Sequence, residues 1–213
     1  FDMDGTLIDT DVGEMILRRR IAAGDSLPGL RALLGPGDLL GAYEAALVGD
    51  VPERHYLACG LANEGESPAG LQARVAALFR EGAVGPRAPV VALARAFAEA
   101  GHEVWIVTGT LRAIAEAVAK QINLDIAGAI GHDLRRAGDR FTSETVGPIL
   151  CGAGKVQACR ARHATPPLIV FGDTVNDLPL MELGILGSVA VPSNDGEMAV
   201  AAAARGIPVA LLH

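Results

Sequence analysis

The stretch FDMDGTL, residues 1–7, places two carboxylates one residue apart at the end of a strand. Strand side chains repeat every second residue, so Asp2 and Asp4 point the same way, and Gly5 permits a sharp turn directly after them. Two like charges this close require a cation or a shared proton. A hard divalent ion with oxygen ligands, most plausibly Mg²⁺, would satisfy them. An ordinary Asp-Gly turn is the alternative for this stretch taken alone.

A second polar stretch, FGDTVNDLP at residues 171–179, follows the buried strand predicted at Leu168–Phe171. Asp173 comes almost directly after the strand, and Asn176 and Asp177 fall within the next helical turn. Acidic and amide groups in this position suit metal coordination at the carboxyl ends of parallel strands. The alternative is a capped turn, with Asp173 or Asn176 as the N-cap of the next helix.

A third stretch, Thr108-Gly109-Thr110, ends the strand predicted at Glu103–Val107. A hydroxyl, a bare backbone amide and a helix N-terminus meet there, and this combination binds phosphate or carboxylate oxygens. The alternative is that Thr110 simply caps the following helix.

The fourth place is Lys155, which follows a glycine-rich turn at residues 152–154. A P-loop does not fit, because Ile149 stands where its pattern needs Gly and Val156 stands where it needs Ser or Thr. Taken alone, Lys155 is predicted to be a surface lysine.

The composition excludes several classes of protein. The chain has 213 residues and a net charge of −7, which argues against a nucleic-acid partner. Hydrophobic residues make up 50%, which excludes a disordered chain. The most apolar stretches are far shorter than the roughly 20 residues of a membrane helix, so no membrane partner is expected. Three cysteines and the lack of a secretory-signal pattern favour a cytoplasmic protein.

From about residue 88, strand-like runs alternate with helical patterns, which predicts a parallel sheet with helices on both faces. A β-hairpin is predicted within residues 126–144, around a Gly-Asp turn. The predicted helices are Val90–Ala100, Leu111–Gln121, a segment from about Asn176 and Glu197–Ala204, and the later strands are Ser188–Val191 and Ile207–Leu212.

Residues 11–85 read differently, since they contain helical runs and glycine-rich breaks without a convincing buried strand. We therefore expect a helical cap at residues 11–85, inserted after the first strand of a core made of residues 1–10 and 86–213. The cap helices are predicted at Glu14–Ala23, Leu39–Val48, Glu53–Ala62 and Leu71–Phe79.

Together and in this order, the four places resemble motifs one to four of the haloacid dehalogenase superfamily of aspartate-nucleophile phosphohydrolases. The wording of the fourth motif and the helical insertion look most like the phosphoserine-phosphatase-like branch. The resemblance implies a three-layer α/β/α, Rossmann-like core with a mostly parallel sheet and a small inserted helical cap. The matching motifs are Asp2-x-Asp4-Gly5-Thr6-Leu7, Thr108-Gly109, Lys155 and Gly172-Asp173-x-x-Asn176-Asp177.

The resemblance also implies a Mg²⁺-dependent phosphatase that hydrolyses a small phosphomonoester through an aspartyl-phosphate. Asp2 would be the nucleophile and Asp4 the general acid/base. Asp2, the backbone carbonyl of Asp4, and Asp173 would hold Mg²⁺. The remaining implied roles are phosphoryl binding by Thr108 and the Gly109 amide, bridging of nucleophile and phosphate by Lys155, and ordering of the metal's water shell or of Lys155 by Asn176 and Asp177.

Two rival functions remain open. A phosphotransferase or mutase would use the same aspartyl-phosphate but pass the group to an alcohol. A protein of another class, a non-catalytic binder of a phosphate ligand, would keep the fold without turnover. Against the binder stands the presence of every charged group that the chemistry needs.

The cap determines which substrate is bound, and in the cap this sequence departs from that of phosphoserine phosphatases. Asp11 stands where those enzymes have a Glu that meets the substrate amine, and Gly60 stands where they have an Arg for the carboxylate. We expect a small phosphorylated metabolite, with Asp11 as a partner for a cationic group or as the N-cap of its helix, and Arg54 as a possible substitute cation. The oligomeric state is not predicted, and further apolar residues are expected to precede Phe1.

Overall fold

The computed structural model describes residues 1–47, 52–191 and 196–210. In these residues the strands form two sheets, one of order β1-β2-β3 and one of order β4-β5. The pairs β1-β2 and β4-β5 are parallel, and β2 pairs antiparallel with β3. The strands are β1 (Trp105–Leu111), β2 (Gly128–Ala137), β3 (Arg140–Val146), β4 (Ile169–Gly172) and β5 (Gly187–Ala190).

The N-terminal segment joins the two sheets. The amino group of Phe1 donates to the Trp105 carbonyl at 2.8 Å, and Val107 N–H donates to the Phe1 carbonyl at 2.8 Å. On the other side, Asp2 N–H donates to the Phe171 carbonyl at 2.9 Å. The segment that carries Asp2 therefore lies between β1 and β4.

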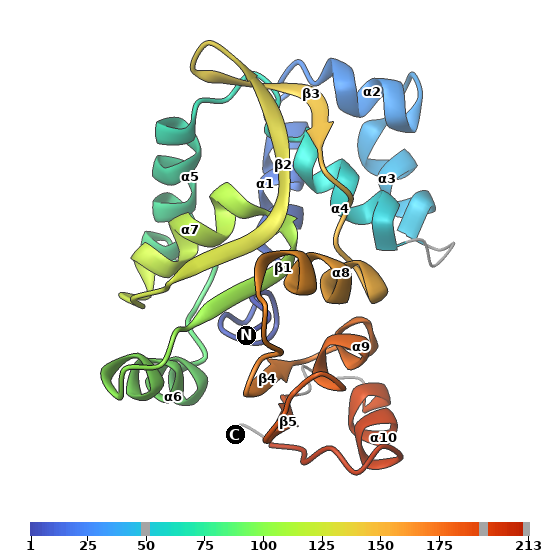
Figure 1. Ribbon diagram of the computed structural model, residues 1–213. Coiled ribbons are helices and arrows are strands. Elements are labelled where there is room, and N and C mark those ends of the chain that lie inside the picture. The colour runs from blue at the N-terminus through green and yellow to red at the C-terminus, as the bar shows by residue number, and fades with distance from the viewer. Residues whose placement is uncertain (48–51, 192–195, 211–213) are drawn as a thin grey trace.

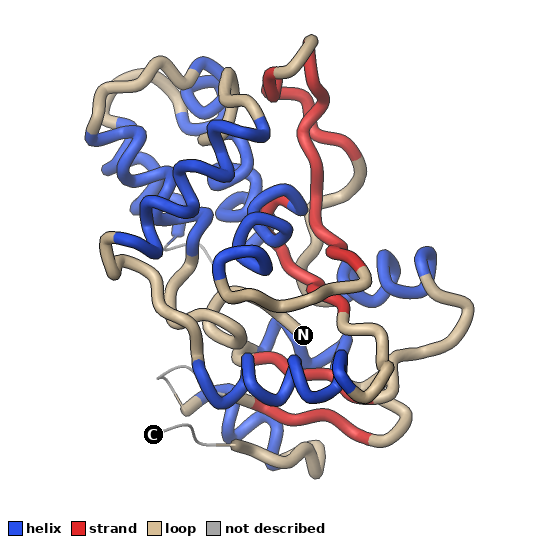
Figure 2. Tube along the Cα trace, turned by 90° about the vertical axis from the view of Figure 1, so that its left-hand side faces the viewer, coloured by secondary structure: helices blue, strands red, loops and turns tan. Residues whose placement is uncertain are grey.

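Helices lie on both sides of the strands (Figure 2), which confirms the predicted three-layer α/β arrangement. The apolar core joins the layers, since Ile106 of β1 packs in the same cluster as Val91, Ile114 and Phe171. The flanking helices are α6 (Ala88–Glu99), α7 (Arg112–Gln121), α8 (Ala153–Arg162), the 3₁₀ turn η1 (Val175–Asp177), α9 (Leu178–Met181) and α10 (Glu197–Ala203).

We call residues 11–85 the helical segment. Its helices α1 to α4 gather at the end of the molecule opposite β5, whereas α5 runs beside α7 (Figure 1). Helix α2 was not predicted, because it has only 7 residues, begins at a proline and is too short to show an apolar period. The helices are α1 (Val12–Ala22), α2 (Pro28–Leu34), α3 (Leu39–Leu47), α4 (Pro52–Leu61) and α5 (Pro68–Arg80).

The helical segment shares one apolar core with the rest of the chain. Leu71 and Leu78 of α5 pack in the same buried cluster as Ile114 and Val118 of α7. The tip of the β2-β3 hairpin also meets this segment, since the N–H of Phe141 donates to the Glu66 carbonyl at 2.9 Å. The division at residues 10/11 and 85/86 stays a prediction.

Three predicted elements differ from the structure. Residues 1–3 form no strand, although Phe1 and Asp2 hydrogen-bond to the backbone of β1 and β4. Strand β1 continues to Leu111, so the Thr108–Thr110 stretch lies inside the strand and not after it. Where the last strand was predicted, at Ile207–Leu212, the described residues contain a single bridge between Ala190 and Val209. Residues 211–213 lie outside the described part. The predicted hairpin is confirmed, with Gly138 at φ +62° in its turn. No helix among the described residues is long and apolar enough to cross a membrane.

Candidate active site

A buried lysine joins two carboxylates at the centre of the site. Lys155 Nζ donates to Asp2 Oδ1 at 2.7 Å and to Asp177 Oδ1 at 2.6 Å. Lys155 is only 2% exposed, so the prediction of a surface lysine, made from that residue alone, is wrong. Lys155 belongs to helix α8. Burial by itself would lower its pKa, but the two carboxylates raise it. The three groups form a buried cluster in which Lys155 pairs with each carboxylate.

Asp173 adds a third carboxylate. Its Oδ1 accepts a hydrogen bond from Thr6 Oγ1 at 3.2 Å. Gly5, at φ +75°, passes so close that a Cβ there would overlap the Asp173 carboxylate, which explains the glycine of the first stretch. Burial and the neighbouring Asp2 and Asp177 raise the pKa of Asp173 to about 8, and burial and Asp177 raise the pKa of Asp2 to about 6.

These carboxylates fit a divalent cation. Asp2, Asp173 and Asp177 each offer an oxygen, and the three oxygens lie within 4.8 Å of one another. Three carboxylates against the Lys155 ammonium leave two excess negative charges when all are ionised. A hard ion such as Mg²⁺ would neutralise that excess and keep the acids ionised at neutral pH. The resemblance gives Asp177 the ordering of the metal's water shell or of Lys155, and its bond to Lys155 Nζ at 2.6 Å fits the second role.

The turn after β4 holds Asp177 in place. Asp177 Oδ2 accepts hydrogen bonds from the N–H groups of Asp173 and Thr174 and from Thr174 Oγ1, each at 3.2 Å. Thr174 is therefore the N-cap, and the two N-cap alternatives, Asp173 and Asn176, are both wrong. Asn176 is half-buried and forms no hydrogen bond with this cluster in the described part of the chain. Gly172 leaves the space that the Asp177 side chain occupies.

Asp4 lies where the helical segment begins. Its Oδ1 accepts from Val12 N–H at 3.0 Å, and its Oδ2 accepts from Thr110 Oγ1 at 3.2 Å. Burial, together with the charges of Asp11 and Asp2, raises the pKa of Asp4 well above its ordinary value. A carboxylic acid whose pKa is raised in this way holds its proton to higher pH than an exposed one, which suits a proton donor.

The end of β1 is held by its own side chains. Thr108 Oγ1 accepts from Thr110 N–H at 3.1 Å, and Thr110 reaches Asp4, so Thr110 does not cap α7. The N-cap of α7 is Leu111, which makes no side-chain capping bond. The ring of Tyr56 from α4 covers Gly109, since a Cβ on Gly109 would lie 2.6 Å from that ring. Glycine is required at this contact.

His132 supports this site although the sequence analysis did not single it out. It is 1% exposed, its Nδ1 donates to the Gly109 carbonyl at 2.8 Å, and its Nε2 has no partner among the described residues. The Nε2 edge faces Gly60 of α4, where any side chain would collide with it. Burial lowers the pKa of His132. Tyr56 and Gly60 stand one helical turn apart, so one face of α4 contacts both Gly109 and its supporting histidine.

Of the two predicted substrate residues, Asp11 lies near enough to Asp4 to raise its pKa, whereas Arg54 does not reach the carboxylates. Asp11 is the N-cap of α1, as one of its two readings expected: its Oδ1 accepts from Glu14 N–H at 2.7 Å, and its Oδ2 lies 3.1 Å from His55 Nε2. Arg54 is exposed and donates to the Leu33 carbonyl at 3.1 Å. The structure does not bring Arg54 to the site.

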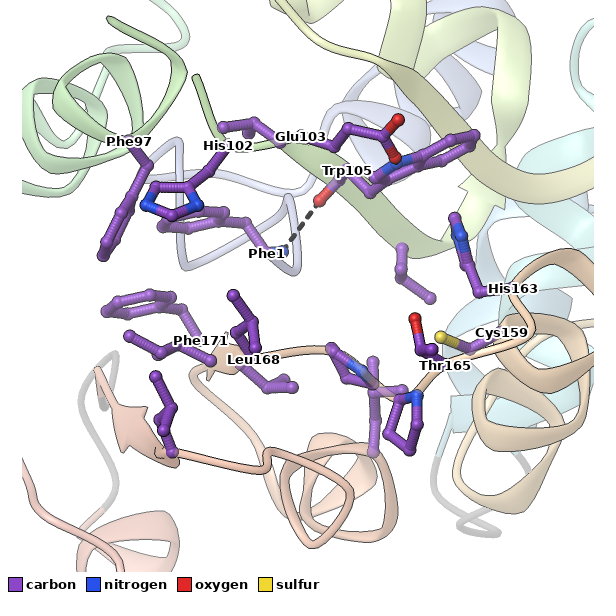
Figure 3. Close-up of a pocket in the computed structure, with 18 residues that line it drawn as sticks. Phe1, Phe97, His102, Glu103, Trp105, Cys159, His163, Thr165, Leu168 and Phe171 are labelled. Atoms are coloured by element: carbon purple, nitrogen blue, oxygen red, sulfur yellow. Dashed lines mark hydrogen bonds between the residues drawn. The ribbon is translucent and has the colours of Figure 1, made fainter. Parts of the chain in front are cut away.

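A cavity of about 310 Å³ lies elsewhere, between the amino-terminal halves of β1 and β4 (Figure 3). Its lining is mostly apolar and includes none of the four motifs' polar side chains. Ligands of open α/β sheets bind at the opposite, carboxyl ends of the strands. The carboxylates, and not this cavity, are therefore the candidate active site. Residues that line it include Phe1, Phe97, His102, Trp105, Leu168 and Phe171.

Comparison with curated sequences finds relatives among hydrolases. Phosphoserine phosphatase SerB1 of Mycobacterium tuberculosis (strain ATCC 25618 / H37Rv) is 30% identical over 113 residues, which cover 51% of this chain and 35% of that protein. Putative hydrolase ML2424 of Mycobacterium leprae (strain TN) is 28% identical over 113 residues, 51% of this chain and 36% of that protein. The chain spans about a third of the length of these curated relatives.

Solved structures share the fold at low sequence identity. A protein of unknown function from Bordetella pertussis Tohama I has a TM-score of 0.74 and 22% identity, over 100% of this chain and 97% of that one. A substrate-bound phosphoserine phosphatase has a TM-score of 0.57 and 14% identity, over 90% of this chain and 83% of that one. The model of the family described as haloacid dehalogenase-like hydrolase matches residues 1–182, and the chain belongs to that family.

Proposed function

We propose that this protein is a Mg²⁺-dependent phosphatase that hydrolyses a small phosphomonoester through an aspartyl-phosphate on Asp2. The observation that carries the proposal is the buried Lys155, held at 2.7 and 2.6 Å between Asp2 and Asp177. Burying a charged lysine is costly unless opposite charges pair with it, and Asp2 and Asp177 supply that pairing here. A phosphate dianion repels an attacking carboxylate, and an ammonium group between them removes much of that repulsion.

In the first step, an Asp2 carboxylate oxygen attacks phosphorus and the bond to the ester oxygen breaks. The Thr108 hydroxyl and the Gly109 amide are suited to hold the phosphoryl oxygens, because they follow Val107 on β1, whose N–H pairs with the residue before Asp2. The leaving alkoxide takes the proton that Asp4 carries. The raised pKa of Asp4 supports this acid role.

In the second step, Asp4, now ionised, accepts a proton from the water that hydrolyses the aspartyl-phosphate. Inorganic phosphate leaves, and Asp2 returns as a free carboxylate. The hydrogen bonds from Val12 N–H and Thr110 Oγ1 hold the Asp4 carboxylate through both steps and stabilise its ionised form.

Asp2, Asp173 and the Asp4 carbonyl are the proposed Mg²⁺ ligands, and Asp177, whose two oxygens accept from Lys155 and from the turn after β4, holds Lys155 beside them. A bound Mg²⁺ supplies positive charge for the phosphoryl group and for the crowded carboxylates. The net negative charge of the whole chain argues against a nucleic-acid substrate and is compatible with a small phosphorylated metabolite.

The test is phosphate release from a panel of small phosphomonoesters, phosphoserine included, with and without Mg²⁺. Asp2→Asn keeps the shape of the nucleophile and removes its charge, so release is expected to fall by at least about 10³-fold. Asp9→Asn is the matched control, because Asp9 lies in the same loop but is exposed and bonds to Gly85. Equal release from Asp2→Asn and wild type would contradict the proposal.

The same experiment separates the two rival functions. A phosphotransferase would release less free phosphate when an alcohol acceptor is added, with the missing phosphate recovered on the acceptor. A non-catalytic binder would bind a phosphate mimic without turnover of any ester.

A further inference from the structure

A second group of metal-ligating side chains lies within the helical segment. Asp11, His55 and Cys59 each offer one ligand atom, and the three atoms lie within 4.8 Å of one another. His55 Nε2 is 3.1 Å from Asp11 Oδ2 and 3.9 Å from Cys59 Sγ. His55 and Cys59 stand one turn apart on α4, and Asp11 caps α1. Two helices thus bring three different ligand types to one point.

The two His55 distances are close to those of a tetrahedral transition-metal site. Bonds of about 2.3 Å to sulfur and about 2.0–2.2 Å to nitrogen and oxygen separate S from N by about 3.6 Å and N from O by about 3.4 Å. The distances here, 3.9 and 3.1 Å, each differ from those values by about 0.3 Å. A small side-chain adjustment would therefore complete the geometry.

The neighbours of these ligands are already arranged as in a metal site. His55 Nδ1 lies 2.8 Å from the Tyr43 hydroxyl, which fixes the ring and leaves Nε2 toward the other ligands. The Glu14 N–H holds Asp11 Oδ1 at 2.7 Å and leaves Oδ2 toward the same point. Metal-binding histidines and carboxylates are typically held by such outer hydrogen bonds.

We propose that Asp11, His55 and Cys59 form a binding site for a divalent transition ion of the zinc class. Thiolate and imidazole favour Zn²⁺ or Co²⁺ over Mg²⁺, which takes oxygen ligands. The side chains of Asp11 and His55 are 25% and 17% exposed, which gives an ion access and leaves a fourth position for water. Cys59 is buried at 1% and forms the closed side of the site.

Binding has a defined proton balance. The Cys59 thiol loses its proton to become a ligand, and the His55 proton leaves Nε2. A neutral ring moves this proton to Nδ1, beside the Tyr43 hydroxyl, and one proton is released to buffer for each ion; a charged ring releases it as well, and two protons are released. No substrate takes part, so the proposal stands or falls separately from the phosphatase activity.

The test is titration of the chelator-treated chain with Co²⁺ in excess Mg²⁺, followed by absorbance. The Mg²⁺ fills the site of Asp2, Asp173 and Asp177, which contains no sulfur. We expect about one Co²⁺ per chain, an intense near-ultraviolet thiolate-to-cobalt band, and loss of that band when Zn²⁺ displaces the cobalt. Calorimetry in two buffers of different ionisation enthalpy measures the protons released.

Cys59→Ser keeps the size of the side chain and removes the thiolate. We expect it to lose the band and to weaken Zn²⁺ binding by at least about 100-fold. Cys159→Ser is the matched control, because Cys159 is also a buried free thiol but packs against the α/β part of the core. Tyr43→Phe removes only the outer hydrogen bond to His55, so a loss of about 10-fold is expected.

Three outcomes would overturn the proposal. They are a wild-type protein that shows no thiolate band, a band that persists in Cys59→Ser, and a band that is lost in Cys159→Ser. If Cys59→Ser does not fold, His55→Gln takes its place with the same expected loss. A protein without the band would leave these residues as a hydrogen-bonded chain from Tyr43 through His55 to Asp11.

Discussion

The two sides of the candidate active site hold their polar groups in different ways. On the α/β side, Lys155 hydrogen-bonds to both Asp2 and Asp177, and all three residues are buried. On the side of the helical segment, Tyr56 and Gly60 contact the site by shape, through the bare Cα of Gly109 and the edge of His132. The α/β side supplies the charged groups, whereas the helical segment supplies close steric contacts. Substitutions on the two sides should therefore fail in different ways.

The largest effect is expected for Lys155→Ala. It leaves Asp2 and Asp177 buried beside each other without their shared cation, which costs about 3–5 kcal/mol of unfolding free energy at neutral pH. Phosphate release should also fall by about 10²–10³-fold. Urea unfolding and steady-state kinetics measure the two effects. Lys120→Ala is the control, because Lys120 is exposed at the end of α7 and should change stability by less than about 0.5 kcal/mol.

A smaller effect is expected on the other side from Gly60→Ala. The new methyl group would collide with His132 Nε2, so α4 must shift away from Gly109. Overpacking of this kind costs about 1–3 kcal/mol, measurable by urea unfolding. Gly41→Ala is the control, because only the exposed side chain of Asp38 lies near that helical glycine. If both glycine variants were equally stable, the contact between α4 and His132 would carry no weight.

Tyr56→Ala sharpens the comparison further, because it removes the cover of Gly109 without touching a charge of the buried cluster. We expect kcat/KM to fall by about 10-fold, mainly through KM, since the lost contact is worth about 1–3 kcal/mol of binding. Tyr56→Phe keeps the ring and should stay within about two-fold of wild type. A fall in kcat at constant KM would assign Tyr56 to the charged side instead.

The smallest effect is a pH dependence from His132. Burial lowers its pKa below the ordinary 6.5, so the unfolded chain binds this proton more readily than the folded one. The folded state therefore loses stability as pH falls below about 6.5, by at most about 1.4 kcal/mol per pH unit. His132→Asn keeps a donor for the Gly109 carbonyl and should remove this part of the acid sensitivity.

Urea midpoints at pH 7.5 and 5.5 measure the difference, with the exposed His102→Asn as control. An acid sensitivity that is unchanged in His132→Asn would mean that His132 takes up its proton without leaving the folded state.

The same contrast marks what the sequence could predict. The α/β class and the motif residues Asp2, Asp4 and Asp173 follow from local patterns, because strand periodicity and parallel order bring the carboxyl ends of strands to one edge. Such patterns survive in the sequence because each involves only a few neighbouring residues. The metal and phosphate roles of these residues stay predictions until they are measured.

The tertiary structure alone decided the other contacts. Lys155 looks like a surface residue by composition, and only its bond to Asp2, 153 residues away, makes it a buried charge. The bond of His132 to Gly109 spans 23 residues, and that of His55 to Asp11 spans 44. Periodicity reports which face of one element is buried, but not which element it meets. For that reason the sequence determined the chemical groups of this protein, whereas packing decided which of them touch.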